Sequence, residues 1–263
     1  MKKTSALACI VAAVFFLLLL SGCKKLLDYI TPSPDNKAQH CRIERVTSNF
    51  TNPNLPGEGH FFDTAWFAYN EHGNPVSIKY VFPDDEIFTN DKAFKYDHHN
   101  RLSVYLDGVP NNLIALFWHK YTYMGDYVII DSTFEYAQGD WSANDVPDYA
   151  EDALISITRY ELDYLGRIIK ETGGFNDENI TYNYDGNGNL IKPGVNYSNK
   201  INLRRTNKVW MFLDRDYSLN SPVGDASQYN GEKLPVKLNE MPQFIYDADF
   251  GFNDIVVKYK CKN

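Results

Sequence analysis

Apolar and polar residues alternate along much of the chain, most clearly on both sides of a short polar turn after Tyr69. Ala65, Phe67 and Tyr69 occupy every second position before this turn, and Ile78 and Tyr80 do so after it. A period of two on both sides of a tight turn is typical of a β-hairpin. No long stretch shows the period of an amphipathic helix, so the pattern predicts an all-β protein.

The same alternation follows a second turn, after Tyr96. Leu102, Val104 and Leu106 are separated by Ser103 and Tyr105. We therefore expect Leu102, Val104 and Leu106 to share one face of a strand.

The turns are copies of one short motif. It begins with Tyr, or once with Leu, and continues with Asp or Asn, two variable residues, and Gly or Asn at the fifth position. Weaker echoes begin at Tyr123 and Tyr229. Because Tyr69, Tyr96 and Tyr123 follow one another at intervals of 27 residues, an array of supersecondary units is indicated. The second and fifth positions of the four clear copies are Asn70 and Gly73, Asp97 and Asn100, Asp163 and Gly166, and Asp185 and Gly188.

Each position of the motif has a physical reason. An Asp or Asn side chain can accept a hydrogen bond from the backbone two residues on and so start a turn. The fifth position requires a left-handed backbone, which Gly adopts without steric cost. Asn100 is the exception among the four clear copies, and Asn tolerates that conformation better than other non-glycine residues.

The repeats predict the architecture. A single hairpin cannot bury its apolar face, so the copies must add side by side. We expect an antiparallel meander of β-hairpin repeats that forms an open, twisted or curled sheet, as one domain over residues 38–263. The copies are unevenly spaced, and the gaps near residues 137–153 and 191–225 predict loops or lost units.

Three of the motif copies, "YDHHNRL", "LDYLGRI" and "YDGNGNL", resemble the YD or Rhs-type repeat, whose core reads YD-x-x-G-R-L. The chain also resembles exported lipoproteins of Gram-negative bacteria that carry a few degenerate copies of this repeat. The resemblance covers roughly residues 60–260 and is strong only at the four turns. It implies an open, twisted antiparallel sheet, because six units are too few to enclose a cavity as the large Rhs proteins do.

The N-terminus predicts export and a lipid anchor. Lys2 and Lys3 precede an apolar stretch, which "LSGC" ends at Cys23; this order is typical of a secretory signal. "LSGC" resembles the bacterial lipobox. The resemblance implies that the signal peptide, residues 1–22, is removed, that Cys23 is acylated, and that residues 23–37 tether the domain to the Gram-negative envelope, at the outer membrane. The periplasmic and surface faces both remain open, as does an ordinary signal peptide with an unmodified cysteine.

The charge balance narrows the partners. The formal net charge is −8, and loss of residues 1–22 makes it more negative because that segment holds two lysines and no acid. Nucleic-acid binding needs basic clusters, so it is not expected. Broad contact with anionic lipid is not expected either.

Two cysteines remain in the folded region. Cys41 and Cys261 lie near its two ends, each in phase with apolar neighbours, and an exported protein can hold disulfides. We predict a Cys41–Cys261 bridge, which would add about 5 kcal/mol to stability on the chain-entropy model. Two separate buried thiols are the alternative.

Metal and cofactor sites have little support in the sequence. Oxygen-bearing side chains gather around Gly251, as in a calcium loop, although a tight acidic turn before the last strand is the favoured interpretation. His72, His98 and His99 occur in turns without the spacing of a zinc site, and we expect no cofactor. The calcium candidates are Asp247, Asp249, Asn253 and Asp254.

Three functions are open. The favoured one is a non-enzymatic envelope lipoprotein that serves as a scaffold or protein-interaction domain. The chain contains no Gly-x-Ser-x-Gly nucleophile motif, no His-Glu-x-x-His zinc motif, no phosphate-binding loop and no dinucleotide-binding motif. A glycan-binding module is the alternative, because aromatic residues make up 15% of the chain and sugars stack on exposed rings. A hydrolase with convergent carboxylates is the third. The tryptophans that could form a sugar platform are Trp66, Trp118, Trp141 and Trp210.

Overall fold

The computed structural model describes residues 41–50, 64–81, 91–109, 116–136, 154–245 and 252–262. The expected Cys23 anchor and its tether, Trp141 and the 137–153 segment lie outside these ranges.

One large antiparallel sheet dominates the described chain and contains 13 strands. From β1 to β10 each strand pairs with the next one in the sequence, and the last strand, β15, returns beside β1 and carries β14 and then β13. The strands are β1 (Cys41–Phe50), β2 (Thr64–Tyr69), β3 (Pro75–Val81), β4 (Asp91–Tyr96), β5 (Leu102–Val109), β6 (Leu116–Tyr123), β7 (Val128–Tyr136), β8 (Leu154–Leu162), β9 (Ile168–Gly173), β10 (Glu178–Thr181), β13 (Ala226–Tyr229), β14 (Pro235–Leu238) and β15 (Phe252–Cys261).

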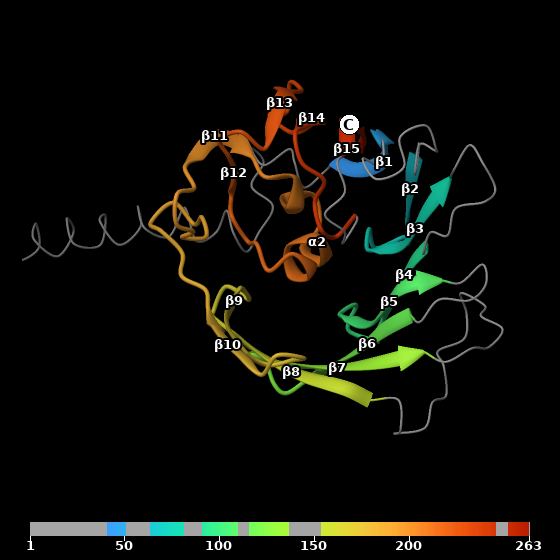
Figure 1. Ribbon diagram of the computed structural model, residues 1–263, viewed down its shortest axis with the longest axis vertical. Coiled ribbons are helices and arrows are strands. Elements are labelled where there is room, and N and C mark those ends of the chain that lie inside the picture. Colours follow the sequence, from blue (N-terminus) through green and yellow to red (C-terminus); the bar gives the residue numbers. More distant parts are fainter. Residues whose placement is uncertain are drawn as a thin grey trace, which may run out of the picture.

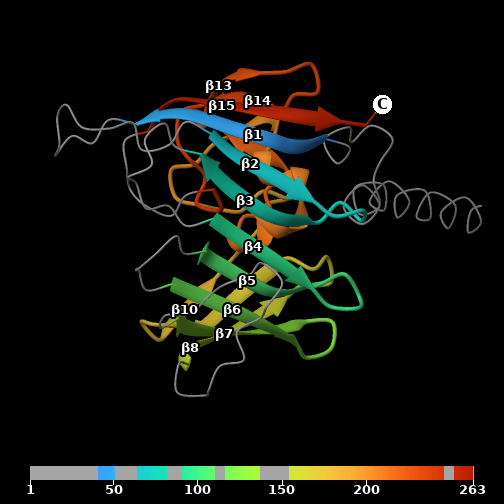
Figure 2. The ribbon, with the colours of Figure 1, turned by 90° about the vertical axis from the view of Figure 1, so that its right-hand side faces the viewer.

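The sheet curls into an arc that surrounds helix α2 (Lys208–Leu213), as Figure 1 shows. Turned by 90°, the strands lie one above another from β13 to β8 (Figure 2). The two ends of the sheet, β10 and β13, do not pair with each other. The predicted all-β antiparallel meander, open and curled, is therefore confirmed.

The repeated motif forms the hairpin turns. In the β8–β9 turn, Asp163 Oδ1 accepts hydrogen bonds from the backbone N–H groups of Leu165 and Arg167, both at 2.9 Å. Gly166 has a φ of +74°. Asn230 forms the same two bonds in the β13–β14 turn, where Lys233 takes the left-handed position with a φ of +62°. The turn that begins at Tyr229 is thus a complete copy despite its weak sequence match.

In the copies that begin at Tyr96 and Tyr123, the tyrosine of the motif joins the unit to the previous one. The Tyr96 hydroxyl donates to the carbonyl of Pro75 at 2.7 Å, and the Tyr123 hydroxyl donates to Leu102 at 2.8 Å. Both acceptors are the seventh residue of the preceding copy. The guanidinium of Arg101 lies 4.1 Å from the centre of the Tyr123 ring. Burial raises the pKa of Tyr123 to about 12, so its hydroxyl stays a donor at neutral pH.

A bulge after the second turn changes the phase of β5. Tyr96 pairs with Leu102, but Lys95 pairs with Val104, so one residue is skipped. Leu102 packs in the main core on the concave face, whereas Val104 and Leu106 join a second cluster on the convex face. The expectation that these three leucine and valine side chains share one face was wrong, because a bulge inserts an extra residue and reverses the alternation.

Residues 191–225 fold into the interior of the arc and form most of what we call the plug. The plug contains β11 (Tyr197–Ile201), η3 (Leu203–Thr206), α2 and β12 (Asn220–Pro222). Trp210 of α2 is fully buried, and its ring stacks on Phe244 at 4.7 Å and meets Phe67 and Phe94 edge-on. The expectation of loops or lost units here was wrong for this segment, because the curled sheet needs apolar side chains to fill its concave face.

The plug also binds the repeat turns by hydrogen bonds. Asn207 Nδ2 donates to the carbonyl of Gly73 at 2.9 Å, and Lys208 Nζ donates to that of Asn100 at 3.1 Å. Both acceptors are fifth residues of a turn. The left-handed positions therefore shape the hairpins and also hold the start of α2.

A disulfide links Cys41 of β1 to Cys261 of β15, where the two residues are direct cross-strand partners. It joins the first and last strands of the described chain across a sequence separation of 220 residues.

We expect the bridge to contribute strongly to stability. Reduction should lower the free energy of unfolding by about 2–5 kcal/mol, because a very long loop is released in the unfolded chain. Urea titrations with and without dithiothreitol measure this. A Cys41→Ser, Cys261→Ser double variant should have the urea midpoint of the reduced protein, and dithiothreitol should not change it. Equal midpoints for oxidised and reduced wild type would contradict the expectation.

The tyrosine link can be tested with one hydroxyl. Tyr123→Phe should lower the free energy of unfolding by about 1 kcal/mol, because it removes one intramolecular hydrogen bond and leaves the ring in place. Tyr127→Phe is the matched control, because Tyr127 lies in the next turn and is 55% exposed. If both variants show the same urea midpoint as wild type, the link does not stabilise the array.

Candidate ligand-binding groove

A polar groove lies on the concave face, where strands β5–β9 face the end of α2. Two adjoining cavities form it, of about 190 and 330 Å³. Both are lined by His119, Thr133, Phe175 and Arg215. Volumes of this size are near the lower end of those of small-molecule sites.

The strand register brings the polar side chains together. Tyr105, His119, Thr133 and Ser156 are successive cross-strand partners from β5 to β8. Directly opposite residues in an antiparallel sheet point to the same face, so these four form one row across the sheet. Asp131 belongs to the adjacent row, again on the concave face.

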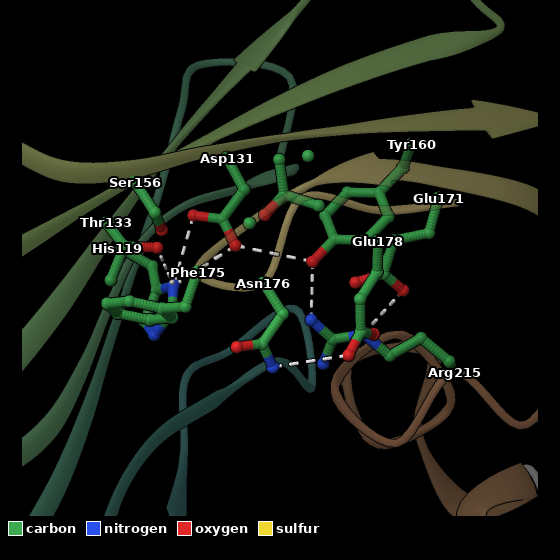
Figure 3. A pocket seen from close by; sticks show the side chains of 13 residues that line it. His119, Asp131, Thr133, Ser156, Tyr160, Glu171, Phe175, Asn176, Glu178 and Arg215 are labelled. Carbon is green, nitrogen blue, oxygen red and sulfur yellow. Dashed lines mark hydrogen bonds and ion pairs between the residues drawn. The ribbon is translucent and has the colours of Figure 1, made fainter. Parts of the chain in front are cut away.

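A chain of hydrogen bonds crosses the groove (Figure 3). His119 Nδ1 lies 3.1 Å from both carboxylate oxygens of Asp131 and 3.3 Å from Thr133 Oγ1. The Tyr160 hydroxyl lies 3.5 Å from Asp131 Oδ2 and accepts a hydrogen bond from Arg215. Burial raises the pKa of Tyr160 well above its ordinary value, so it remains a neutral link between the acid and the arginine.

Arg215 enters the groove from the plug. It has a φ of +50°, rare for a residue with a side chain. Its Nε lies 3.6 Å from Glu171 Oε2, and the same carboxylate accepts a bond of 2.7 Å from the Tyr182 hydroxyl. Burial alone would lower the pKa of Arg215, but Tyr160 and Glu171 raise it above its usual value. The arginine is therefore a fixed cation between sheet and plug.

Aromatic rings lie at the mouth of the groove. Phe117 is 42% exposed and Phe175 is 64% exposed, and their rings meet edge-on with centres 6.0 Å apart. Deeper in, the His119 ring stacks on Tyr105 at 5.5 Å. Lys92 Nζ donates to the Tyr105 hydroxyl at 3.0 Å. The groove thus combines an apolar rim with a polar floor.

One side-chain feature and one backbone feature characterise the sheet side of the groove. Ser156 Oγ is buried and has no hydrogen-bond partner among the described residues. Gly173 has a φ of +89°, and a Cβ there would lie 2.4 Å from the carbonyl oxygen of Ile157. Only glycine fits this close approach, which begins the turn that carries Phe175 and Asn176 to the rim.

The residues singled out from the sequence lie elsewhere. The eight turn residues of the repeat occupy chain reversals, and none of them lines the two cavities. Among the tryptophans, Trp118 and Trp210 are buried and Trp66 is 42% exposed on the convex face, where it stacks with Arg45. No row of exposed tryptophans is present in the described ranges.

The calcium candidates can be placed only in part. Asp247, Asp249 and the side chain of Asn253 lie outside the described residues. Asp254 binds Lys237 Nζ at 2.9 Å. Across the described ranges, no group of three or more His, Cys, Asp or Glu side chains is arranged to hold a metal ion.

Sequence reasoning missed the groove. His119 lies in β6 and contacts Asp131, but no motif marked it as part of a site. A signal was available: Asp131, Thr133 and Thr158 are polar at inward positions of their strands and are nevertheless buried. Buried polar groups in a sheet face are unusual and indicate a network or a site.

Comparison with known proteins gives no match: neither a family model, nor a curated protein, nor a solved structure is similar to this chain. In the part of the chain that the structure describes, no helix has the length and apolar character needed to cross a membrane.

The close packing at Gly173 leads to a prediction. Gly173→Ala should lower the melting temperature much more than Gly125→Ala, because both positions have a positive φ but only Gly173 has backbone against its missing side chain. We expect a loss of about 1–2 kcal/mol at Gly125 from the left-handed backbone alone, and more at Gly173. Thermal unfolding followed by circular dichroism measures both; equal losses would show that the approach to Ile157 is easily relieved.

Proposed function

We propose that this chain is a lipid-anchored, non-enzymatic binding protein of the Gram-negative cell envelope, in which the curled sheet is a rigid scaffold and the concave groove is the binding site. The observation that carries the proposal is the groove itself. It is the place where fixed polar groups and exposed aromatic rings face the same open space.

The polar groups of the groove support binding. Asp131 is held by His119 and Tyr160, and Glu171 is held by Arg215 and Tyr182. Side chains fixed in this way lose little entropy when a ligand arrives, so they recognise it efficiently.

The scaffold role is supported by the links between its parts. The tyrosine bonds join successive hairpins, the plug joins the turns, and the disulfide joins the first strand to the last. A sheet held at this many places keeps its concave face in one shape, as a preorganised binding surface requires.

The anchor can be tested separately. Cys23→Ala should move the protein from the membrane fraction to the soluble fraction of the cell, because several acyl chains together give firm anchoring. Fractionation with immunoblotting measures this, and mass spectrometry of the wild-type N-terminus should show an acylated Cys23. An unmodified cysteine in the wild type would refute the anchor and leave the groove hypothesis intact.

The binding role is tested by capture from the envelope. The acylated protein is solubilised in detergent and used to pull down its partners, with a Phe117→Ala, Phe175→Ala variant beside it. We expect the partner to be lost in this variant. Trp66→Ala is the matched control, because Trp66 has the same exposure as Phe117 but lies on the convex face. If the partner were lost only with Trp66→Ala, the binding surface would lie on the convex face and the proposal would be refuted.

A further inference from the structure

We infer that the groove binds a neutral saccharide, with one or two sugar rings against Phe117 and Phe175 and their hydroxyl groups on the polar floor. This inference rests on the proposed function, because it names the ligand class of the same site.

The rim provides the surface that a sugar ring needs. A pyranose has apolar C–H faces that pack on aromatic rings and polar hydroxyls around its edge. Phe117 and Phe175 expose their rings at the mouth of the groove, from two segments that are distant in sequence. Exposed phenylalanines have no polar group of their own to satisfy, so an apolar ligand face is the partner that stabilises them.

The floor provides donors and acceptors for the hydroxyl groups of a sugar. His119 uses Nδ1 for Asp131, which leaves Nε2 for a ligand. Ser156 Oγ is buried without a partner among the described residues, so a ligand hydroxyl or a water is needed to satisfy it. Nearby, Asn176 Nδ2 donates to Glu178 Oε1 at 3.3 Å. Amide and carboxylate groups side by side suit the paired hydroxyls of a sugar.

The charges favour a neutral ligand over an anionic one. Asp131, Glu171 and Glu178 line the smaller cavity together with a single arginine, Arg215. Arg215 is already engaged by Glu171 and Tyr160. In the smaller cavity an incoming phosphate or carboxylate would meet this surplus of acids, whereas hydroxyl groups can accept from the arginine and donate to the acids.

The size of the groove limits the ligand. Cavities of about 190 and 330 Å³ share four lining residues, so they lie side by side in the groove. A space of this kind accommodates one or two sugar rings. The exposed position of Phe175 leaves the outer end open, so a longer glycan can continue into solvent.

The test is calorimetric titration of the acylated protein in a detergent that contains no sugar. The neutral probes are glucose, galactose, mannose, N-acetylglucosamine and their β-1,4-linked disaccharides; the anionic probes are glucuronate and glucose 6-phosphate. We expect at least one neutral probe to bind with a Kd below about 1 mM and the anionic probes to bind more weakly. Phe175→Ala and Phe117→Ala should each weaken binding by about tenfold.

The controls separate this inference from the proposed function. Trp66→Ala should bind the probe as wild type does, and Ser156→Ala should weaken binding while the melting temperature and circular dichroism stay unchanged. Absence of binding by every neutral probe, or tighter binding of the anionic ones, would overturn the saccharide assignment. The saccharide assignment can fail while the Phe117→Ala, Phe175→Ala double variant still loses the envelope partner. The groove then remains a binding site, but for another ligand. If neither readout depends on the groove, both ideas fail.

Discussion

A curled sheet must have its concave face filled, and the rest of this structure depends on how the chain meets that requirement. Trp210 lies at the centre of the arc, with Phe244 stacked on it and Phe67 and Phe94 against its edge. These rings come from sheet and plug alike, so neither buries its apolar surface without the other. Without the plug, the hairpins would have an exposed apolar face of the kind that leads sheets to associate.

The repeat motif explains why the sheet curves around the plug in a regular way. The copies that begin at Tyr69, Tyr96 and Leu162 each supply a turn whose Asp or Asn fixes the reversal, a bulge that shifts the strand phase, and a carbonyl that accepts the hydroxyl of a later tyrosine. Bulges increase local twist and bend a strand. The tyrosine links join neighbouring copies, and the Cys41–Cys261 bridge joins β1 to β15 within the sheet, whose two ends stay open.

The groove exists because the plug covers only part of the concave face. Most of the concave face packs on the plug, including Tyr121 and Tyr160 against Phe212 of α2, whereas His119, Asp131 and Thr133 make a neighbouring part of β6 and β7 polar. Polar side chains there cannot be covered by apolar ones without a desolvation penalty. Arg215, at the end of the plug, meets this polar part and fixes its charges. The polar side chains that keep this part of the concave face uncovered are therefore also the groups that can bind a ligand.

Features that depend on neighbours along the chain could be predicted from the sequence. The period of two, the Asx turns and the left-handed fifth positions gave the hairpins and their meander, because the hydrogen bonds that form them span only a few residues. Tertiary structure alone decided the phase of β5, the folding of residues 191–225 into a plug, and the meeting of His119, Asp131 and Arg215. These depend on a bulge that only strand pairing reveals and on contacts between residues far apart in sequence, and no local pattern encodes which distant segment fills a given space.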